Sequence, residues 1–205
     1  MTQETDDDSQ VEPPLLVVLS GPSGVGKDTV LQSMRDLGLQ MHYAITVTTR
    51  ERRPKEIDGF HYHFIPIERF TEFRDRDEFL EWANVYGKLY GSLKQPVKDA
   101  LDRGQDVMLK IDVQGARSIR ARVPDALTIF LAPPSIEWLK EHLVARKTET
   151  PEKLKERQVA AIDELASADE FDHVVVNRDN DVEAVVREIV HLIAQARPNR
   201  PYLKL

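Results

Sequence analysis

The chain has 205 residues, of which 41% are hydrophobic and 31% charged, the balance of an ordinary soluble globular protein. A net charge of −7 argues against broad binding to nucleic acid, and no apolar run reaches the roughly 18–20 residues that a membrane span needs. Cysteine is absent, which excludes disulfides, thiol catalysis and thiolate-bound metals and fits a cytoplasmic protein.

The first thirteen residues, MTQETDDDSQVEP, predict a disordered acidic leader, because they are rich in acidic and polar residues and contain almost no large apolar ones. They lack the basic-then-apolar order of a signal peptide. A folded domain is therefore expected over residues 14–200.

Short apolar runs alternate with helical patterns along the rest of the chain. Strands are expected at 15–20, 43–47, 106–111, 127–131 and 173–176, and helices at 27–37, 95–103, 114–122, 136–146, 151–166 and 181–196. Continuous apolar runs are typical of strands buried on both faces. The sequence therefore predicts an α/β fold in three layers, with helices on both faces of a central parallel sheet.

Two stretches interrupt this alternation. Residues 46–93 hold nine of the fourteen Phe, Trp and Tyr residues, a turn signal at Asp58-Gly59 and an alternating pattern over 60–65. They predict an inserted lobe with its own small core. Residues 146–157, RKTETPEKLKER, are charged and almost free of large apolar side chains, and they predict a mobile segment between two helices.

A glycine-rich loop, GPSGVGKDT, follows the first predicted strand and leads into the first predicted helix. Its G-x-x-x-x-G-K pattern is that of a phosphate-binding P-loop, in which backbone amides and the start of a helix attract anions. Lys27 is expected to span the β- and γ-phosphates of ATP. The predicted ATP-binding residues of this loop are Gly21, Pro22, Ser23, Gly24, Val25, Gly26, Lys27, Asp28 and Thr29.

Asp28 stands where the P-loop motif has Ser or Thr. A carboxylate is also a hard oxygen ligand and can hold Mg²⁺, although it adds negative charge beside a triphosphate. Asp28 is therefore the predicted metal ligand, and a neighbouring positive group is expected to offset its charge.

Five further stretches resemble the guanylate kinases: TTRERRPKEIDGFHYHF (48–64), FLEWANVYGKLYGS (79–92), KIDVQGARSIR (110–120), APPS (132–135) and VVVN (174–177). The likeness runs from about residue 15 to 196. It implies a P-loop core (14–45, 94–141 and 165–200), an inserted lobe that binds the nucleoside monophosphate (46–93) and a helical lid (142–164). It also implies ATP-dependent phosphorylation of GMP, and of dGMP, to GDP with Mg²⁺. Whether the protein is a monomer or a homo-oligomer stays open.

The resemblance places a GMP site in the inserted lobe. Guanidinium groups and phenol hydroxyls suit a phosphate dianion. A carboxylate can accept from N1–H and the exocyclic amine of guanine, which adenine does not offer on that edge. The GMP-binding residues implied by the resemblance are Thr46, Arg50, Arg53, Tyr62, Glu81, Tyr90, Ser92 and Asp112, with Glu81 as the guanine-reading carboxylate. Taken alone, the arginines also suit a basic surface turn, Glu81 an exposed position on an amphipathic helix, and Asp112 a helix cap.

Other residues match the phosphoryl-transfer machinery. Arg146 and Arg157 match lid arginines that close over the triphosphate, and with Lys27 and Arg50 they are the catalytic residues that the resemblance implies. A third lid position, usually Arg, is His142 here. Asn177 is expected near the adenine of ATP.

One further departure concerns Lys110, since the family often carries an acidic residue two positions before Asp112. Strand ends beside a P-loop lie close together in this kind of sheet. We therefore expect Asp28 and Lys110 to form a coupled pair, in which the carboxylate has moved from the sheet to the loop and the lysine balances it.

Two other functions remain open. Scaffold domains of this fold bind phosphopeptides, but they typically lack the P-loop lysine that this chain keeps as Lys27. A related kinase acts on a ribosyl bisphosphate, but Glu81 and Ser92 argue against that substrate, because a sugar phosphate has no N1–H donor.

Overall fold

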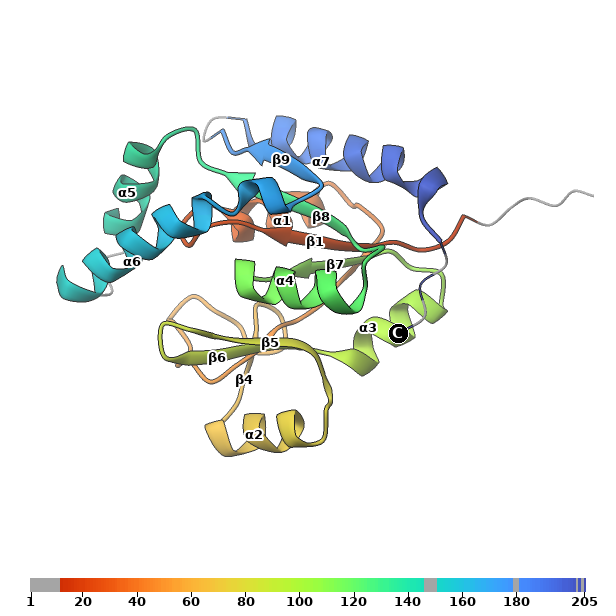
Figure 1. The fold of residues 1–205 in the computed structure, drawn as a ribbon, viewed down its shortest axis with the longest axis horizontal. Helices are drawn as coiled ribbons and strands as arrows, with labels where there is room; N and C mark the ends of the chain where they lie inside the picture. The colour runs from red at the N-terminus through yellow and green to blue at the C-terminus, as the bar shows by residue number, and fades with distance from the viewer. Residues whose placement is uncertain (1–11, 146–150, 179–180, 202, 204) are drawn as a thin grey trace, which may run out of the picture.

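The computed structural model describes residues 12–145, 151–178, 181–201, 203 and 205. A five-stranded parallel sheet forms the centre, in the order β2-β7-β1-β8-β9 (Figure 1). Its strands are β1 (Leu16–Ser20), β2 (His42–Tyr43), β7 (Val107–Lys110), β8 (Leu127–Ala132) and β9 (His173–Val176). The predicted parallel sheet is confirmed, and β1, which leads into the P-loop, lies in its middle.

Helices cover both faces of this sheet, which confirms the three layers. The helices of the core are α1 (Lys27–Asp36), α3 (Lys94–Asp102), α4 (Val113–Arg122), α5 (Ile136–Ala145), α6 (Pro151–Leu165) and α7 (Val182–Ala196), with short 3₁₀ turns at Ala168–Glu170 and Arg197–Asn199. Val17 and Leu19 of β1 pack in one cluster with Met34 of α1 and Ile189 of α7. Leu16 packs on the opposite face with residues of α3 and α4. This alternation is what a strand buried on both faces requires.

Residues from 47 to 93 form a second sheet beside the first (Figure 1). Its order is β4 (His63–Phe64), β3 (Val47–Thr48), β6 (Lys88–Leu93) and β5 (Phe79–Val85), and α2 (Ile67–Asp75) covers its outer side. Val47, Phe70 and Phe79 make its core, with the two phenylalanine rings stacked 4.4 Å apart. Helix α4 contacts β5, so it lies between the two sheets.

Three local expectations change. The strand expected at 43–47 is divided between β2 in the first sheet and β3 in the second, because the chain crosses from one sheet to the other there. The alternating pattern over 60–65 yields only the two residues of β4. Helix α6 begins at Pro151, a favourable first helical position for proline, which confirms the helix expected at 151–166 and makes the second half of the predicted 146–157 segment helical. Residues 146–150 lie outside the described residues.

The start of the described chain is held by contacts with the far end. Residues 1–11 of the predicted leader lie outside the described residues. Glu12 pairs with Arg197 at 3.2 Å, and the Arg197 guanidinium also donates to the carboxylate of Asp106. The backbone N–H of Leu15 donates to the same Asp106. These bonds fix the entry into β1.

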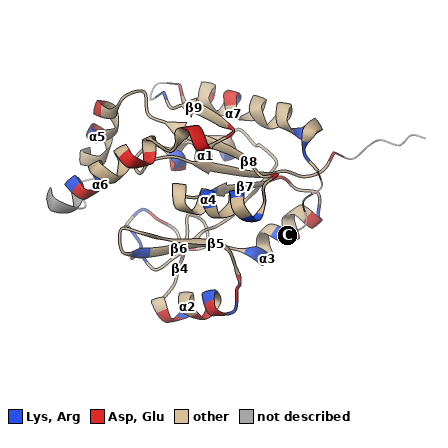
Figure 2. Cartoon of the chain, viewed as in Figure 1, with Lys and Arg blue, Asp and Glu red and all other residues tan. Residues whose placement is uncertain are grey.

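Acidic and basic residues occur together on the outer helices α2, α5 and α6 (Figure 2). Among the described residues, no helix combines the length and the apolar character that crossing a membrane requires. Because both signs of charge are mixed on these helices, the charge at the site is set by its individual side chains.

Candidate functional site

A cavity of about 140 Å³ lies between the P-loop, the end of β7 and the second sheet. Most of the predicted site residues line it: Gly21, Ser23, Gly24, Val25, Gly26, Lys27, Asp28, Thr46, Arg50, Arg53, Tyr62, Glu81, Tyr90, Asp112 and Arg157. The fold thus brings the two predicted nucleotide sites to one space. Pro22, Thr29, Ser92 and Asn177 are not part of its lining, and Arg146 lies outside the described residues.

The backbone alone shapes the P-loop. Gly21 and Gly26 have φ angles of 137° and 96°, which residues with a side chain rarely adopt. A Cβ on Gly21 would lie 2.2 Å from the carbonyl oxygen of Leu131, so the loop packs directly on the end of β8. The N-cap residue of α1 is Gly26, which has no side chain to cap the helix, and the start of a helix favours a bound anion.

Lys27 folds back onto this loop. Its ammonium nitrogen donates to the carbonyl oxygens of Gly21, at 2.5 Å, and of Pro22, at 3.1 Å. Burial lowers its pKa to about 8, although neighbouring carboxylates such as Glu164 oppose that change. A buried ammonium bound to neutral carbonyls can exchange them for phosphate oxygens, which are stronger acceptors.

Glu164 of α6 is a member of this site that the sequence did not reveal. Its Oε2 accepts a hydrogen bond from the backbone N–H of Ser23 at 3.0 Å, so a carboxylate of the chain lies at the P-loop. Burial raises the pKa of Glu164. The one available signal is spacing: Glu164 and Arg157 are two helical turns apart on α6, and both line the cavity.

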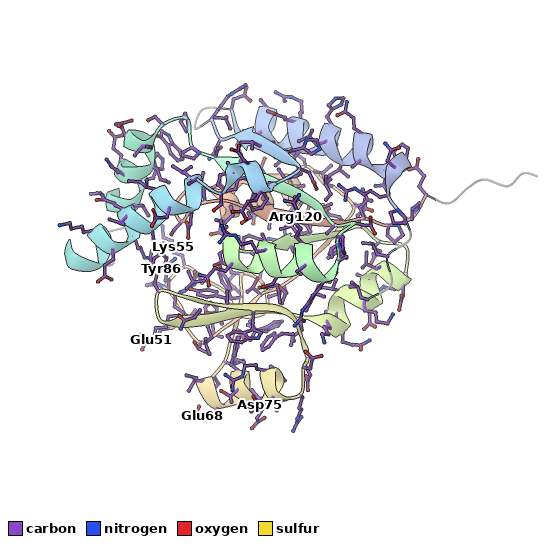
Figure 3. All side chains as sticks on the ribbon, viewed as in Figure 1. Glu51, Lys55, Glu68, Asp75, Tyr86 and Arg120 are labelled. Atoms are coloured by element: carbon purple, nitrogen blue, oxygen red, sulfur yellow. The ribbon has the colours of Figure 1, made fainter. Side chains whose placement is uncertain are left out.

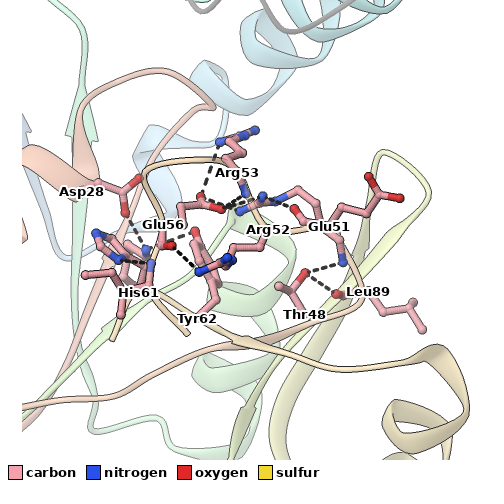
Figure 4. Close-up of polar contacts among 12 residues, drawn as sticks. Asp28, Thr48, Glu51, Arg52, Arg53, Glu56, His61, Tyr62 and Leu89 are labelled. Atoms are coloured by element: carbon pink, nitrogen blue, oxygen red, sulfur yellow. Dashed lines mark hydrogen bonds and ion pairs between the residues drawn. The ribbon is translucent and has the colours of Figure 1, made fainter. Parts of the chain in front are cut away.

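A second carboxylate, Glu56, lies at the predicted monophosphate site (Figure 4). Two nitrogens of the Arg50 guanidinium donate to its two oxygens at 2.9 and 2.8 Å, and the backbone N–H of Arg53 donates to it at 2.8 Å. Burial opposes ionisation of Glu56, but the bonds from Arg50 outweigh burial and lower its pKa. Glu56 stands in the same motif as both arginines but was not among the predicted GMP-binding residues.

The tyrosines lie around the same arginine. The guanidinium of Arg50 lies 5.3 Å from the ring centre of Tyr62, and the rings of Tyr62 and Tyr90 meet edge to face at 6.1 Å. The predicted monophosphate residues are therefore assembled, and the basic-surface-turn alternative is wrong for Arg50, whose side chain is largely buried.

The expected neighbourhood of Asp28 and Lys110 is present. The Lys110 Nζ lies 2.5 Å from the Asp28 Oδ1 and donates to the Tyr62 hydroxyl at 3.1 Å. Because Lys110 ends β7, in register with Leu19 of β1, its side chain reaches the P-loop helix. The contact between the two departures from the family pattern is thus confirmed; their coupling in function stays a prediction.

Glu81 lies on β5, not on a helix, and is only 3% exposed. The surface-helix alternative is therefore wrong. The Ser92 hydroxyl donates to its Oε1 at 2.7 Å, and burial raises the pKa of Glu81 to about 8. A Cβ on Gly115 would lie 2.5 Å from its Oε2, so the carboxyl group sits against the first turn of α4.

Asp112 and Thr46 complete this side of the cavity. The Asp112 Oδ1 accepts from the N–H of Gly115 at 2.9 Å and caps α4, so the helix-cap interpretation holds while the residue also lines the cavity. Burial raises the pKa of Asp112. The buried Thr46 hydroxyl lies 3.4 Å from the carbonyl oxygen of Lys110.

The remaining predicted residues occupy different positions. Arg157 lines the cavity from α6, with its guanidinium 5.0 Å from the ring of Tyr86 at the turn between β5 and β6 (Figure 3). His142 stacks on Trp138 within α5 at 3.7 Å. Asn177 is buried behind the P-loop and donates to the carbonyl oxygen of Val25 at 2.7 Å, so it supports the loop; its contact with adenine remains a prediction.

Asp28 is the side chain best suited to a metal ion. Within the part of the chain that the structure describes, no three His, Asp or Glu residues gather as an all-protein metal site. Mg²⁺ in phosphoryl-transfer sites needs only one or two carboxylates, because phosphate oxygens and water supply the other ligands. The Asp28 carboxylate follows Lys27 directly and lines the cavity, so the donor set fits that ion.

The chain is similar to known proteins along nearly its whole length. The family model "Guanylate kinase" matches residues 14–196. A guanylate kinase from Carboxydothermus hydrogenoformans is 46% identical over 177 residues, 84% of this chain and 87% of that protein. One from Mycobacterium leprae is 44% identical over 183 residues, 88% and 86% of the two chains. The crystal structure of guanylate kinase from Anaplasma phagocytophilum superposes with a TM-score of 0.72 at 28% identity, covering 91% of this chain and 87% of that one.

Proposed function

The chain belongs to the guanylate kinase family, and we propose that it transfers the γ-phosphoryl group of ATP to GMP, and to dGMP, giving ADP and the diphosphate. The observation that carries this proposal is the shared cavity. A P-loop with Lys27 lies at one end, and the Arg50 and Glu81 groups of the second sheet lie at the other. A donor and an acceptor bound there would meet without crossing solvent.

The acceptor phosphate is held by the second sheet. Arg50 and Arg53 offer guanidinium donors, and Tyr62 and Tyr90 add neutral hydroxyls around them. Glu56 holds the Arg50 fork in place, and the phosphate takes the remaining donors of Arg50 and Arg53. No general base is needed, because the GMP phosphate oxygen that attacks is already anionic.

The donor phosphates are held by the P-loop. Lys27 exchanges its carbonyl partners for the β- and γ-phosphate oxygens, and Arg157 approaches the transferring group from α6. Arg146 is proposed for the same role from the predicted lid. Mg²⁺, held by Asp28, would neutralise charge on the β- and γ-phosphates. The protein contributes alignment of the two phosphates and fixed positive charge around them.

Guanine selection rests on Glu81. Once ionised, its carboxylate accepts from N1–H and the exocyclic amine of guanine, with Ser92 fixing one oxygen. Adenine would leave this buried group without donors, a mismatch that costs several orders of magnitude in specificity where the site is dry.

The test is phosphoryl transfer by the purified protein from Mg·ATP, with GMP and AMP offered side by side and EDTA as the metal-free control. We expect ADP with GMP and hardly any with AMP. GMP binding without ADP formation would contradict the proposal and favour a binding module instead.

A further inference from the structure

Three side chains form a continuous path between the two phosphate sites: Asp28 on the P-loop helix, Lys110 at the end of β7, and Tyr62 beside β4. The Lys110 Nζ contacts the other two at 2.5 and 3.1 Å and lies 4.2 Å from the centre of the Tyr62 ring. Asp28 and Tyr62 lie in the same region of Figure 4. One ammonium group therefore touches a residue of each predicted substrate site.

This contact joins a buried ammonium to an exposed carboxylate. The Lys110 side chain is 11% exposed, whereas the Asp28 side chain is 62% exposed. The lysine is thus fixed in the interior, and the carboxylate is the member that can turn toward a ligand. Because the ammonium is buried, its charge is screened less by solvent and salt than that of an exposed lysine.

Lys110 also determines what the Tyr62 hydroxyl can do. Because that oxygen accepts from Lys110, its own hydrogen points elsewhere and can be donated to a phosphate oxygen. Hydrogen bonds in such a chain polarise one another, so a stronger bond from the ammonium makes the tyrosine a better donor.

From this geometry we propose that Lys110 is a positioning residue that couples the two substrate sites, a role that rests on the proposed function. When Asp28 turns toward a metal bound with ATP, it gives up part of its bond to Lys110. The ammonium charge then acts more strongly on Tyr62 and on the GMP phosphate. Mg·ATP and GMP consequently strengthen each other's binding, by an equal factor in both directions.

The experiment is a calorimetric titration of GMP into the full-length protein, without nucleotide and with a saturating non-hydrolysable ATP analogue plus Mg²⁺. We expect the analogue to tighten GMP binding at least about fivefold in the wild type. In Lys110→Met that factor falls to below about twofold, and Lys110→Arg restores part of it because it keeps the charge. With EDTA in place of Mg²⁺ the wild type loses most of the coupling.

Two further variants make the result decisive. Asp28→Asn changes an exposed side chain, so it tests the same path should Lys110→Met fail to fold, and it too should lose the coupling. Lys98→Met, on the outer side of α3 where Lys98 pairs with Asp102, is the matched control and should keep the wild-type factor.

An unchanged factor in folded Lys110→Met and Asp28→Asn, or no coupling in the wild type, overturns the proposal. Wild-type phosphoryl transfer to GMP, measured in parallel, separates this failure from that of the proposed function. If the wild type transfers phosphate to GMP but its coupling factor does not depend on Lys110, only the coupling proposal is wrong. If the wild type binds no GMP, both the coupling proposal and the proposed function are wrong.

Discussion

The two phosphate sites are built in different ways, yet each holds a carboxylate of its own chain. At the P-loop, Glu164 accepts one bond from the N–H of Ser23. At the second sheet, Glu56 takes both donors of the Arg50 fork and the N–H of Arg53. Burial raises the pKa of Glu164, whereas the arginine bonds lower that of Glu56 despite burial.

This difference follows from what shapes each site. The P-loop takes its form from backbone angles that only glycine adopts easily and from the bond of Asn177 to Val25, not from charged side chains. The second site consists of long side chains, which need a partner to stay in one rotamer. Glu56 is therefore a support for Arg50, and Glu164 is a competitor for the P-loop. The same residue type should thus have opposite effects in the two places.

Of the substitutions that test this difference between the two sites, the removal of the Lys27 charge should change activity most. Lys27→Met keeps the volume of the side chain but leaves the P-loop with amide donors only, and we expect kcat to fall by about 10³-fold. GMP affinity, measured without ATP, should stay within about twofold, because Lys27 is not among the groups proposed to hold GMP. Steady-state ADP release and GMP calorimetry measure the two effects. A loss of kcat below about tenfold would mean that the backbone suffices.

Glu81→Gln comes next. An amide presents a donor where guanine also has donors, and we expect GMP affinity to drop about 100-fold. The wild type should also bind GMP more tightly as pH rises toward 8, because burial raises the pKa of Glu81 from 4.5 to about 8 and guanine needs the ionised form. Binding at pH 7 should therefore release a proton, seen as a dependence of the binding heat on the buffer.

The raised pKa of Glu81 also affects the stability of the folded protein. Between about pH 4.5 and 8 the folded, ligand-free protein keeps a proton on Glu81 that the unfolded chain has lost, so this group makes the protein less stable as pH rises. Glu81→Gln should flatten this part of the stability curve in chemical denaturation. An unchanged slope in the variant would assign the dependence to another group.

Glu56→Gln tests whether Glu56 holds the Arg50 side chain in position. Losing the ionic fork lets Arg50 leave its position, and we expect the KM for GMP to rise about tenfold while the KM for ATP changes little. Arg69 and Glu72 form an exposed pair on α2, so Glu72→Gln is a matched control that should leave both values unchanged. Tighter GMP binding in Glu56→Gln would instead make Glu56 a competitor.

Glu164→Gln should have the smallest effect and the opposite sign. A neutral amide competes less well for the Ser23 N–H, so we expect Mg·ATP to bind about threefold more tightly. Equilibrium titration with a non-hydrolysable analogue measures this. A weaker affinity would give Glu164 a supporting role like that of Glu56, and the contrast between the two sites would disappear.

Sequence patterns predicted the elements that are long or continuously apolar. Strand β9 and helix α4 lie within a residue of their expected bounds, because burial on both faces and helical periodicity each produce a pattern in the local sequence. The division of 43–47 between two sheets produces no such pattern, because it depends on which strand lies opposite. Glu164 was missed for the same reason: its partner Ser23 is 141 positions away. Sequence motifs located Lys27, Arg50 and Glu81. They did not reveal Glu164 and Glu56, the carboxylates that the fold places at the P-loop and beside Arg50.

The bond from Asn177 to Val25 spans 152 positions of the chain and joins the end of β9 to the loop after β1. The P-loop is therefore synthesised early but completed late. A nascent chain that has left the ribosome only as far as α5 contains all the residues of GPSGVGKDT. It still lacks Asn177, whose side-chain amide donates to the carbonyl oxygen of Val25 in that loop. Nucleotide bound at the P-loop can then stabilise the finished protein only, and we expect the slow step of its maturation to be the docking of β9, the last strand of the central sheet to be made.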